Sequence, residues 1–306
     1  MHKYQQTLGG EYTFTGKGLH TGLNATMTLK PSEVNTGIRF LRTDIGNNAF
    51  IEANVDNVTH TNRSTTLEHN GAKVITIEHV LAALWGLGVD NAIVEIDGVE
   101  VPIMDGSAYH FAKAIISDPL VSQEAEKVIY SLDEEIHYKD EETGAEVLIQ
   151  PSDDFSIDLT TDYGSKVLGV QKYYFDTKSD FYKELAPCRT FVFFHELEFL
   201  FKNNLIKGGD VENAIVIVEN DVPQETLDEM AALFNVQKLE KVSAGYLNNL
   251  SLHFEDECVR HKLLDVIGDF TLVGFRFFGK IIAAKTGHKI NTEVARIIRQ
   301  HAIKIK

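Results

Sequence analysis

The sequence has few cysteines and no long apolar run. Only two of its 306 residues are cysteines, Cys188 and Cys258, and they stand singly, so neither a disulfide framework nor a zinc ribbon built from cysteine pairs is available. This scarcity fits a reducing, cytoplasmic setting. No stretch of about 18 apolar residues occurs, so no membrane-spanning helix is expected. The first ten residues also lack the apolar core of a signal peptide.

Cationic residues are also in short supply. Lysine and arginine number 29 against 45 aspartates and glutamates, which gives a formal net charge of −16. Because nucleic-acid affinity comes largely from cations facing phosphates, this balance argues against a nucleic-acid partner. A small anionic ligand needs only a few cations gathered at one place. We find no low-complexity tract and no internal repeat.

The length and composition are those of a soluble globular protein with about two domains. Apolar residues make up 43% of the chain and charged residues 24%. The best candidate for a linker is 118–127, which contains Pro119 and a polar run. Near the N-terminus, the segment 15–22 (T-G-K-G-L-H-T-G) predicts a tight loop between two strands that presents His20. Its glycine spacing is neither that of a P-loop nor that of a dinucleotide fingerprint.

The segment 259–274 (V-R-H-K-L-L-D-V-I-G-D-F-T-L-V-G) predicts a central amphipathic helix. His261, Asp265 and Asp269 follow one another at four-residue intervals on the side opposite its apolar face. The spacing of His261 and Asp265 allows them to bind one ion, and a nitrogen with a carboxylate oxygen suits Zn²⁺. Taken alone, the same pattern also describes the solvated face of an ordinary helix.

A second helix is expected from Ile77, with Thr76 as its capping residue. Glu78 and His79 then lie in the first turn of a mostly apolar helix, either as site residues or as a capping glutamate and a hydrogen-bonded histidine. As site residues, His79 supplies a third metal ligand and Glu78 a base. With His288 as a proton donor, these parts suit metal-assisted amide hydrolysis.

The region from Arg189 onward is rich in phenylalanine. An aromatic helix, the turn Lys207-Gly208-Gly209 and a strand at 214–218 together predict a βαβ-like insertion. Its phenylalanines also fit plain core packing. An acidic amphipathic helix is expected over 221–242, and a closing helix over 291–301 follows the turn that holds His288.

Six motifs in order carry a resemblance to a known family. They cover most of the chain, from about Gln5 to about His301, and read G-x-G-L-H-T-G, T-I-E-H-V-L-A-A-L, R-T-F, K-G-G, R-H-K-L-L-D-x-I-G-D and K-T-G-H-x-x-N. Together they resemble LpxC, the family of UDP-3-O-acyl-N-acetylglucosamine deacetylases of lipid A biosynthesis.

The resemblance implies an α+β fold of two similarly layered domains with an active site in the cleft between them. We place the domains at 1–123 and 124–306, with insertions in the second at about 191–218 and 221–252. The first insertion is expected to form an apolar passage for the acyl chain. The segment 221–252 is expected to be an addition to the family pattern.

The resemblance also implies the chemical roles of the site residues. His79, His261 and Asp265 are similar to the zinc ligands, and Fe²⁺ also fits this ligand set. Glu78 resembles the general base. His288 resembles the cationic acid that steadies the oxyanion and protonates the leaving amine, with Asp269 holding its charge.

The remaining roles concern substrate binding. Thr190 resembles the hydroxyl that donates to the oxyanion, and Lys262 the contact to the nucleotide phosphates. His20, Gly208 and Gly209 are expected to line the sugar and phosphate region, and Phe191 the acyl passage, which spans 191–205.

The implied substrate is a UDP-linked acylated aminosugar, and the implied location is the cytoplasm. In some lineages the family is fused to a 3-hydroxyacyl-carrier-protein dehydratase domain, so the resemblance allows such a fusion here, and the sequence does not define whether the native chain continues past residue 306. Two other interpretations remain open at this point, a lipid-sugar binding protein without catalysis and a structural metal site. The sequence does not define acyl-chain length or oligomeric state.

Overall fold

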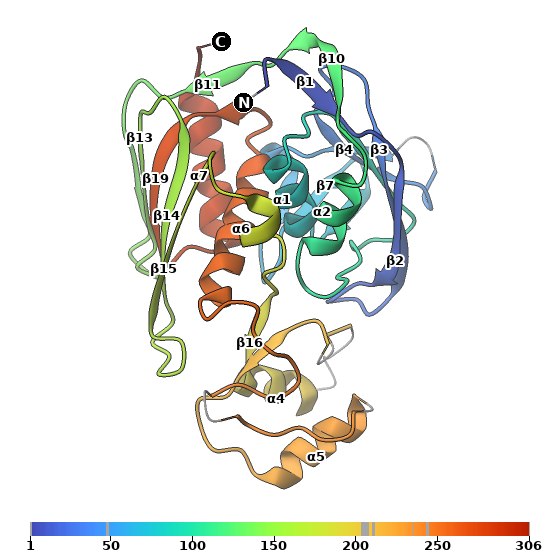
Figure 1. Ribbon diagram of the computed structural model, residues 1–306, viewed down its shortest axis with the longest axis vertical. Coiled ribbons are helices and arrows are strands. Elements are labelled where there is room, and N and C mark those ends of the chain that lie inside the picture. The colour runs from blue at the N-terminus through green and yellow to red at the C-terminus, as the bar shows by residue number, and fades with distance from the viewer. Residues whose placement is uncertain are drawn as a thin grey trace.

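The computed structural model describes residues 2–46, 49–202, 208–209, 212–234, 236–242 and 245–305. Two five-stranded sheets form the outer layers, and the main helices lie between them (Figure 1). A smaller lobe with its own helices projects from one end of this body (Figure 1). The fold is therefore α+β, as expected from the sequence.

The first large sheet has the strand order β2-β3-β9-β4-β5. All its pairings are antiparallel except that of β9 with β4 at the centre, where Val94 lies opposite Phe40. Alternate side chains of β3 and β9 are buried, which matches the two-residue period of a strand with one face on the core. The strands are β2 (Tyr12–Lys17), β3 (Asn24–Pro31), β4 (Ile38–Arg42), β5 (Ala49–Glu52) and β9 (Ala92–Ile96).

The second large sheet repeats this arrangement with the order β12-β13-β19-β14-β15. Its central strand, β19, again pairs antiparallel with one neighbour and parallel with the other. The strands are β12 (Ile136–Lys139), β13 (Glu146–Gln150), β14 (Phe155–Asp162), β15 (Val170–Asp176) and β19 (Gly279–Ala284).

Four smaller sheets are also present among the described residues. Their orders are β1-β10, β6-β7-β8, β18-β11-β20 and β16-β17. The strands are β1 (Tyr4–Thr7), β6 (Val58–His60), β7 (Thr66–His69), β8 (Ala72–Ile75), β10 (Val121–Glu126), β11 (Ile129–Ser131), β16 (Phe191–Phe193), β17 (Ile215–Ile217), β18 (Arg276–Phe277) and β20 (Ile303–Lys304).

Two helices that pack against each other form the centre of the molecule, α1 (Glu78–Gly86) and α6 (Glu257–Thr271). A Cβ at Gly268 of α6 would overlap the carbonyl oxygen of Glu78, so glycine allows the two backbones to approach. Both helices contribute to one continuous core that also includes side chains from both large sheets. The other elements of this body are α2 (Tyr109–Ile115), α3 (Phe181–Glu184), α7 (His288–His301) and the 3₁₀ turn η1 (Val55–Asn57).

The lobe has a separate small core. In it β16 pairs parallel with β17, and the elements α4 (Phe194–Lys202) and α5 (Gln224–Leu233) lie alongside (Figure 1). Buried apolar side chains from both helices and from β17 form this core, among them Phe194, Leu197, Val216, Leu227 and Met230. Plain core packing therefore accounts for Phe194, whereas Phe191 and Phe193 are only half buried.

Several local expectations were wrong. The expected linker 118–127 contains β10, which pairs antiparallel with β1. The helix expected over 221–242 is limited to α5. Thr76 does not cap α1, because its hydroxyl donates to Glu100 and its backbone adopts a φ of +60°. The closing helix α7 begins at His288 itself. None of the helices in the described ranges combines the length and apolarity that crossing a membrane requires.

Candidate metal centre

His79, His261 and Asp265 meet between the two central helices. His79 lies in the first turn of α1, and the other two lie one turn apart on α6. Their candidate ligand atoms all lie within 4.8 Å of one another. Asp265 Oδ1 is 3.6 Å from His79 Nε2 and 3.5 Å from His261 Nε2. All three side chains are buried, so the polar side of α6 is not a solvated helix face.

The hydrogen bonding of this cluster suits a cation. Asp265 Oδ1 is buried and makes no hydrogen bond to any residue that the structure describes. A buried carboxylate oxygen without a donor is costly unless an ion or a water satisfies it. His261 points Nδ1 at the carbonyl oxygen of Cys188, 3.0 Å away, which leaves Nε2 free to bind a metal. Two histidines and one carboxylate form an open zinc ligand set, so the residues fit the implied ion.

Electrostatics keep the ligand groups in the forms that metal binding needs. Burial lowers the pKa of His261 to about 3, so its ring is neutral. Burial acts to raise the pKa of Asp265, but the charge of Lys262 outweighs it and holds that pKa well below the usual range. Lys262 Nζ lies 2.7 Å from Asp265 Oδ2 and 5.4 Å from the ring centre of Phe191.

Glu78 lies beside the cluster and is itself buried. Its Oε2 accepts a hydrogen bond of 3.1 Å from the backbone N–H of Thr65, and its Oε1 lies 3.9 Å from His288 Nε2. Burial raises the pKa of the Glu78 carboxyl, against the lowering effect of His288 and His79. A carboxylate with a raised pKa accepts a proton more readily near neutral pH.

His288 stands at the first position of α7 and is held by Asp269. Its Nδ1 lies 2.9 Å from Asp269 Oδ2, so Nε2 is turned toward Glu78. Burial acts to lower the pKa of His288, but the carboxylates of Asp269 and Glu78 outweigh it and raise the pKa to about 9. The imidazolium form therefore persists at neutral pH.

Asp269 has two hydrogen-bond partners, Thr65 and Asn291, to which no role was assigned from the sequence. The Thr65 hydroxyl donates to Asp269 Oδ1 at 2.6 Å, and the Asn291 amide donates to Asp269 Oδ2 at 2.8 Å. Asn291 is the last residue of the motif K-T-G-H-x-x-N, and its three-residue spacing from His288 puts both on one helix face. Nothing in the sequence around Thr65 indicates its contact, since it joins segments 204 residues apart.

The other predicted residues surround this centre at different distances. Phe191 places its ring centre 6.5 Å from that of His261. Thr190, the preceding residue, is fixed through its backbone, because its N–H donates to the carbonyl oxygen of Gly106. His20 has a buried Nε2 that bonds to no described residue, and burial lowers the pKa of its ring.

Gly208 ties the lobe to the loop that holds His20. Its N–H donates to the carbonyl oxygen of Leu19 at 3.2 Å, and a Cβ at this position would overlap the carbonyl oxygen of Gly18. Gly209 is less constrained, because a Cβ there would meet only the Leu19 side chain at 3.7 Å. Lys207 and residues 203–205 of the expected acyl passage lie outside the described residues.

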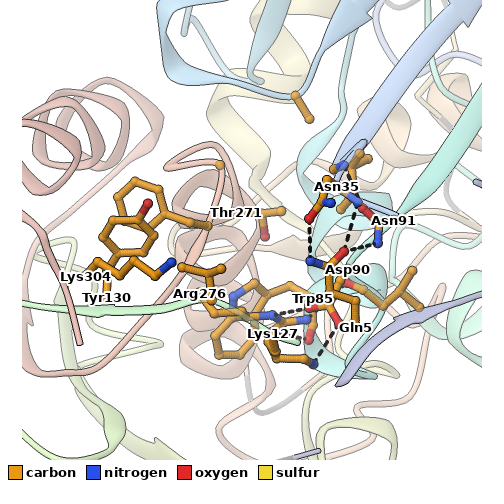
Figure 2. Close-up of a pocket in the computed structure, with 17 residues that line it drawn as sticks. Gln5, Asn35, Trp85, Asp90, Asn91, Lys127, Tyr130, Thr271, Arg276 and Lys304 are labelled. Carbon is orange, nitrogen blue, oxygen red and sulfur yellow. Dashed lines mark hydrogen bonds and ion pairs between the residues drawn. The ribbon is translucent and has the colours of Figure 1, made fainter. Parts of the chain in front are cut away.

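Two cavities differ in their relation to the centre. One of about 370 Å³ is lined by Asp162, Tyr163, Lys285 and Thr286, among others, and borders the segment that leads to His288. Another, of about 340 Å³, lies at the far ends of α1 and α6 (Figure 2). It contains none of the predicted site residues, and its polar side includes Asp90, Lys127 and Arg276.

Comparison with known proteins agrees with this combination of an α+β fold and a buried histidine–aspartate centre. The family model for LpxC, UDP-3-O-acyl N-acetylglycosamine deacetylase, matches residues 5–231 and 239–300. The chain belongs to the LpxC family. Within the matched span only 232–238 is left out, so most of the segment 221–252 aligns with the family model.

The similar proteins fall into two groups. Two named "Bifunctional enzyme LpxC/FabZ", from Bacteroides thetaiotaomicron and Porphyromonas gingivalis, are 42% and 41% identical over 296 residues. These matches cover 97% of this chain but only 64% of each relative, so the chain spans about two thirds of their length. One named "UDP-3-O-acyl-N-acetylglucosamine deacetylase", from Citrifermentans bemidjiense, is 39% identical over 290 residues, which is 94% of this chain and 86% of the relative.

Proposed function

We propose that this chain is a zinc-dependent deacetylase that removes the N-acetyl group of UDP-3-O-acyl-N-acetylglucosamine in lipid A biosynthesis. The observation that carries the proposal is the buried cluster of His79, His261 and Asp265 with Glu78 and His288 beside it, in a chain of the LpxC family. A zinc ion held by the three ligands supplies Lewis acidity toward water and the amide carbonyl. Fe²⁺ can take the same ligand set.

Glu78 acts in this proposal as the general base. It takes a proton from the attacking water as the water oxygen bonds to the acetyl carbon. Its burial favours this role, because the raised pKa brings its proton affinity closer to that needed at neutral pH. The backbone N–H of Thr65 holds one carboxylate oxygen and leaves the other facing His288.

His288 acts as the general acid. As the bond between the acetyl carbon and the sugar nitrogen breaks, Nε2 donates a proton to that nitrogen, so the products are acetate and a free 2-amino sugar. Asp269 maintains the charged ring through Nδ1. The Thr190 hydroxyl donates to the oxyanion that forms on the carbonyl oxygen, a type of contact worth several kcal/mol in other hydrolases.

Substrate binding is assigned to side chains around the centre. The Lys262 ammonium, partly exposed beside Phe191, attracts the nucleotide phosphates. The cavity bordered by Tyr163 and Lys285 has a volume in the range of small-ligand sites and suits the nucleotide end. His20, Gly208 and Gly209 then line the sugar and phosphates.

The acyl chain is assigned to the lobe. Phe191 and Phe193 of β16 present half-buried rings that contact the ring of Tyr163 at centre-to-centre distances of 5.6 and 5.8 Å. These apolar surfaces lie next to the metal ligands, as a substrate with its acyl group near the reacting amide requires. In this arrangement the cleft separates domains at 1–123 and 124–306.

The family assignment extends the proposal in two respects. A cytoplasmic location follows from the resemblance. The two relatives that are named bifunctional enzymes support the possibility of a fusion to a second catalytic domain.

The test measures release of free amine from UDP-3-O-acyl-N-acetylglucosamine, with bound metal quantified in the same samples. Each sample is assayed as prepared, after chelation, and after Zn²⁺ is added back. We expect activity to fall with the metal and to return near one equivalent. Tight metal binding without turnover on any acyl length would instead indicate a structural site or a binding protein. Absence of metal binding would refute the ligand assignment.

A further inference from the structure

A buried ion pair joins the segment before β16 to the first turn of α6. The guanidinium of Arg189 donates from Nε to Glu257 Oε1 at 2.9 Å and from Nη2 to Oε2 at 3.1 Å. Glu257 is fully buried and Arg189 is 5% exposed. The backbone N–H of Arg189 also donates to Oε1, at 3.0 Å. Glu257 therefore holds both the side chain and the main chain of Arg189.

The residues on either side of Arg189 serve the metal centre. The Cys188 carbonyl oxygen accepts from His261 Nδ1, which fixes the ring that presents Nε2 to the cluster. Thr190 carries the hydroxyl assigned to the oxyanion. Glu257 lies one helical turn before His261 on α6, so the carboxylate and the ligand share one face of the helix.

We propose that Arg189 and Glu257 are positioning residues that lock the Cys188 carbonyl against His261 and set the place of Thr190. The part of this inference that concerns Thr190 rests on the proposed function. The effect of the Arg189–Glu257 pair on His261 concerns metal binding alone. Burying two charges is expensive, and an ion pair of this kind contributes little to stability compared with apolar side chains. The bidentate geometry of the pair instead fixes the orientation of the backbone next to Arg189. The Cys188 carbonyl, as the partner of a metal-ligating histidine, requires such a fixed orientation.

A neighbouring ion pair provides a matched control. Arg260 Nε lies 2.6 Å from Asp256 Oδ1 at the same end of α6. The guanidinium of Arg260 lies over the rings of Tyr173 and Phe254, and its remaining hydrogen bonds go to Tyr173 and to the carbonyl oxygen of Glu184. Asp256→Asn therefore removes a charge pair at this helix end without releasing Cys188 or Thr190.

The experiment compares Arg189→Lys, Glu257→Gln and Asp256→Asn with the unaltered protein. Lysine keeps the charge at position 189 but loses the bidentate geometry, whereas glutamine keeps the shape of Glu257 and loses its charge. Three quantities are measured: zinc affinity by competition with a chromophoric chelator, the visible spectrum of the Co²⁺-substituted protein, and kcat and KM separately. Circular dichroism reports whether each variant is folded.

We expect zinc affinity to fall about 10- to 100-fold in the first two variants, as for the loss of other partners of metal-ligating histidines. The Co²⁺ bands should shift, and kcat should fall with little change in KM, while Asp256→Asn leaves all three unchanged. Folded variants with unaltered zinc affinity and Co²⁺ spectrum would overturn the inference, whatever their thermal stability. If either Arg189→Lys or Glu257→Gln does not fold, the other variant tests the inference. If the unaltered protein binds zinc but has no deacetylase activity, the proposed function fails and the metal measurements still decide this inference.

Discussion

His288 Nδ1 lies 2.9 Å from Asp269 Oδ2, and this contact sets the protonation state of the histidine. The folded-state pKa of His288 is about 9, above the ordinary value of 6.5, so the charged form that can donate a proton predominates below that pH. We expect kcat/KM to decline as pH rises through about 9. Asp269→Asn should lower the pKa of His288 and move the decline to lower pH. A pH–rate profile with the decline unmoved in this variant would contradict the assignment of His288 as the acid.

The variant Glu78→Ala tests whether Glu78 is a general base or a metal ligand. The substitution removes a carboxylate that lies next to the cluster but is not one of its three members. We expect kcat to fall by about 10²- to 10⁴-fold, as for loss of a general base, while zinc content stays near one equivalent. Steady-state assays and metal analysis check this, with the exposed Glu68→Ala as control. Loss of zinc from the Glu78→Ala variant would instead indicate that Glu78 is a metal ligand.

Gly208→Ala tests the contact between the lobe and the loop that holds His20. The added methyl group would overlap the Gly18 carbonyl oxygen, so one of the two backbones must move. We expect KM to rise, because His20 shifts with the loop, and the free energy of unfolding to fall by about 1–3 kcal/mol. Gly209→Ala is the matched control for the free energy of unfolding, since its methyl group would meet Leu19 at an ordinary contact distance of 3.7 Å. Equal losses in the free energy of unfolding for the two substitutions would refute the steric argument.

Asp90→Asn tests the ion-pair network far from the metal centre (Figure 2). Asp90 lies 2.8 Å from the buried Lys127 ammonium and 3.4 Å from Arg276 Nε. Removing its charge leaves the buried Lys127 and the largely buried Arg276 without an anionic partner among the described residues, so we expect the free energy of unfolding to fall by about 3–5 kcal/mol. Denaturant titration measures this, and zinc affinity should stay unchanged. The pair of the exposed Asp56 and the half-buried Arg299 provides the control, where Asp56→Asn should change the free energy of unfolding by less than about 1 kcal/mol.

The sequence predicted the parts of the centre that depend on local spacing. His261 and Asp265 are four residues apart on a helix, so their proximity follows from helix geometry alone. Their meeting with His79 depends on packing between helices far apart in the chain, and no local spacing predicts it. It was expected from the need for a third ligand and from the resemblance of several motifs to one family. The burial of Asp269 was not visible either, since its partners Thr65 and Asn291 come from two other segments.

Local signals failed where tertiary contacts outweighed them. Thr76 is an ordinary capping residue by sequence, yet its hydroxyl bonds to Glu100, which also accepts from the backbone N–H groups of His20 and Thr21. The segment 121–126 has mostly polar, exposed side chains, so its composition indicated a linker although its backbone pairs with β1. Strand pairing of this kind depends on a partner more than 100 residues away, which no local pattern records.

The shared strand order of the two large sheets has a consequence for folding. In each sheet the central strand is the last to be synthesised, with β9 placed between β3 and β4, and β19 between β13 and β14. Until that strand emerges from the ribosome, the two flanking hairpins have no common partner and each exposes an unpaired inner edge. Because β19 follows β14 by more than 100 residues, the second sheet closes late, and its inner edges stay open to wrong pairing while that intervening segment is made.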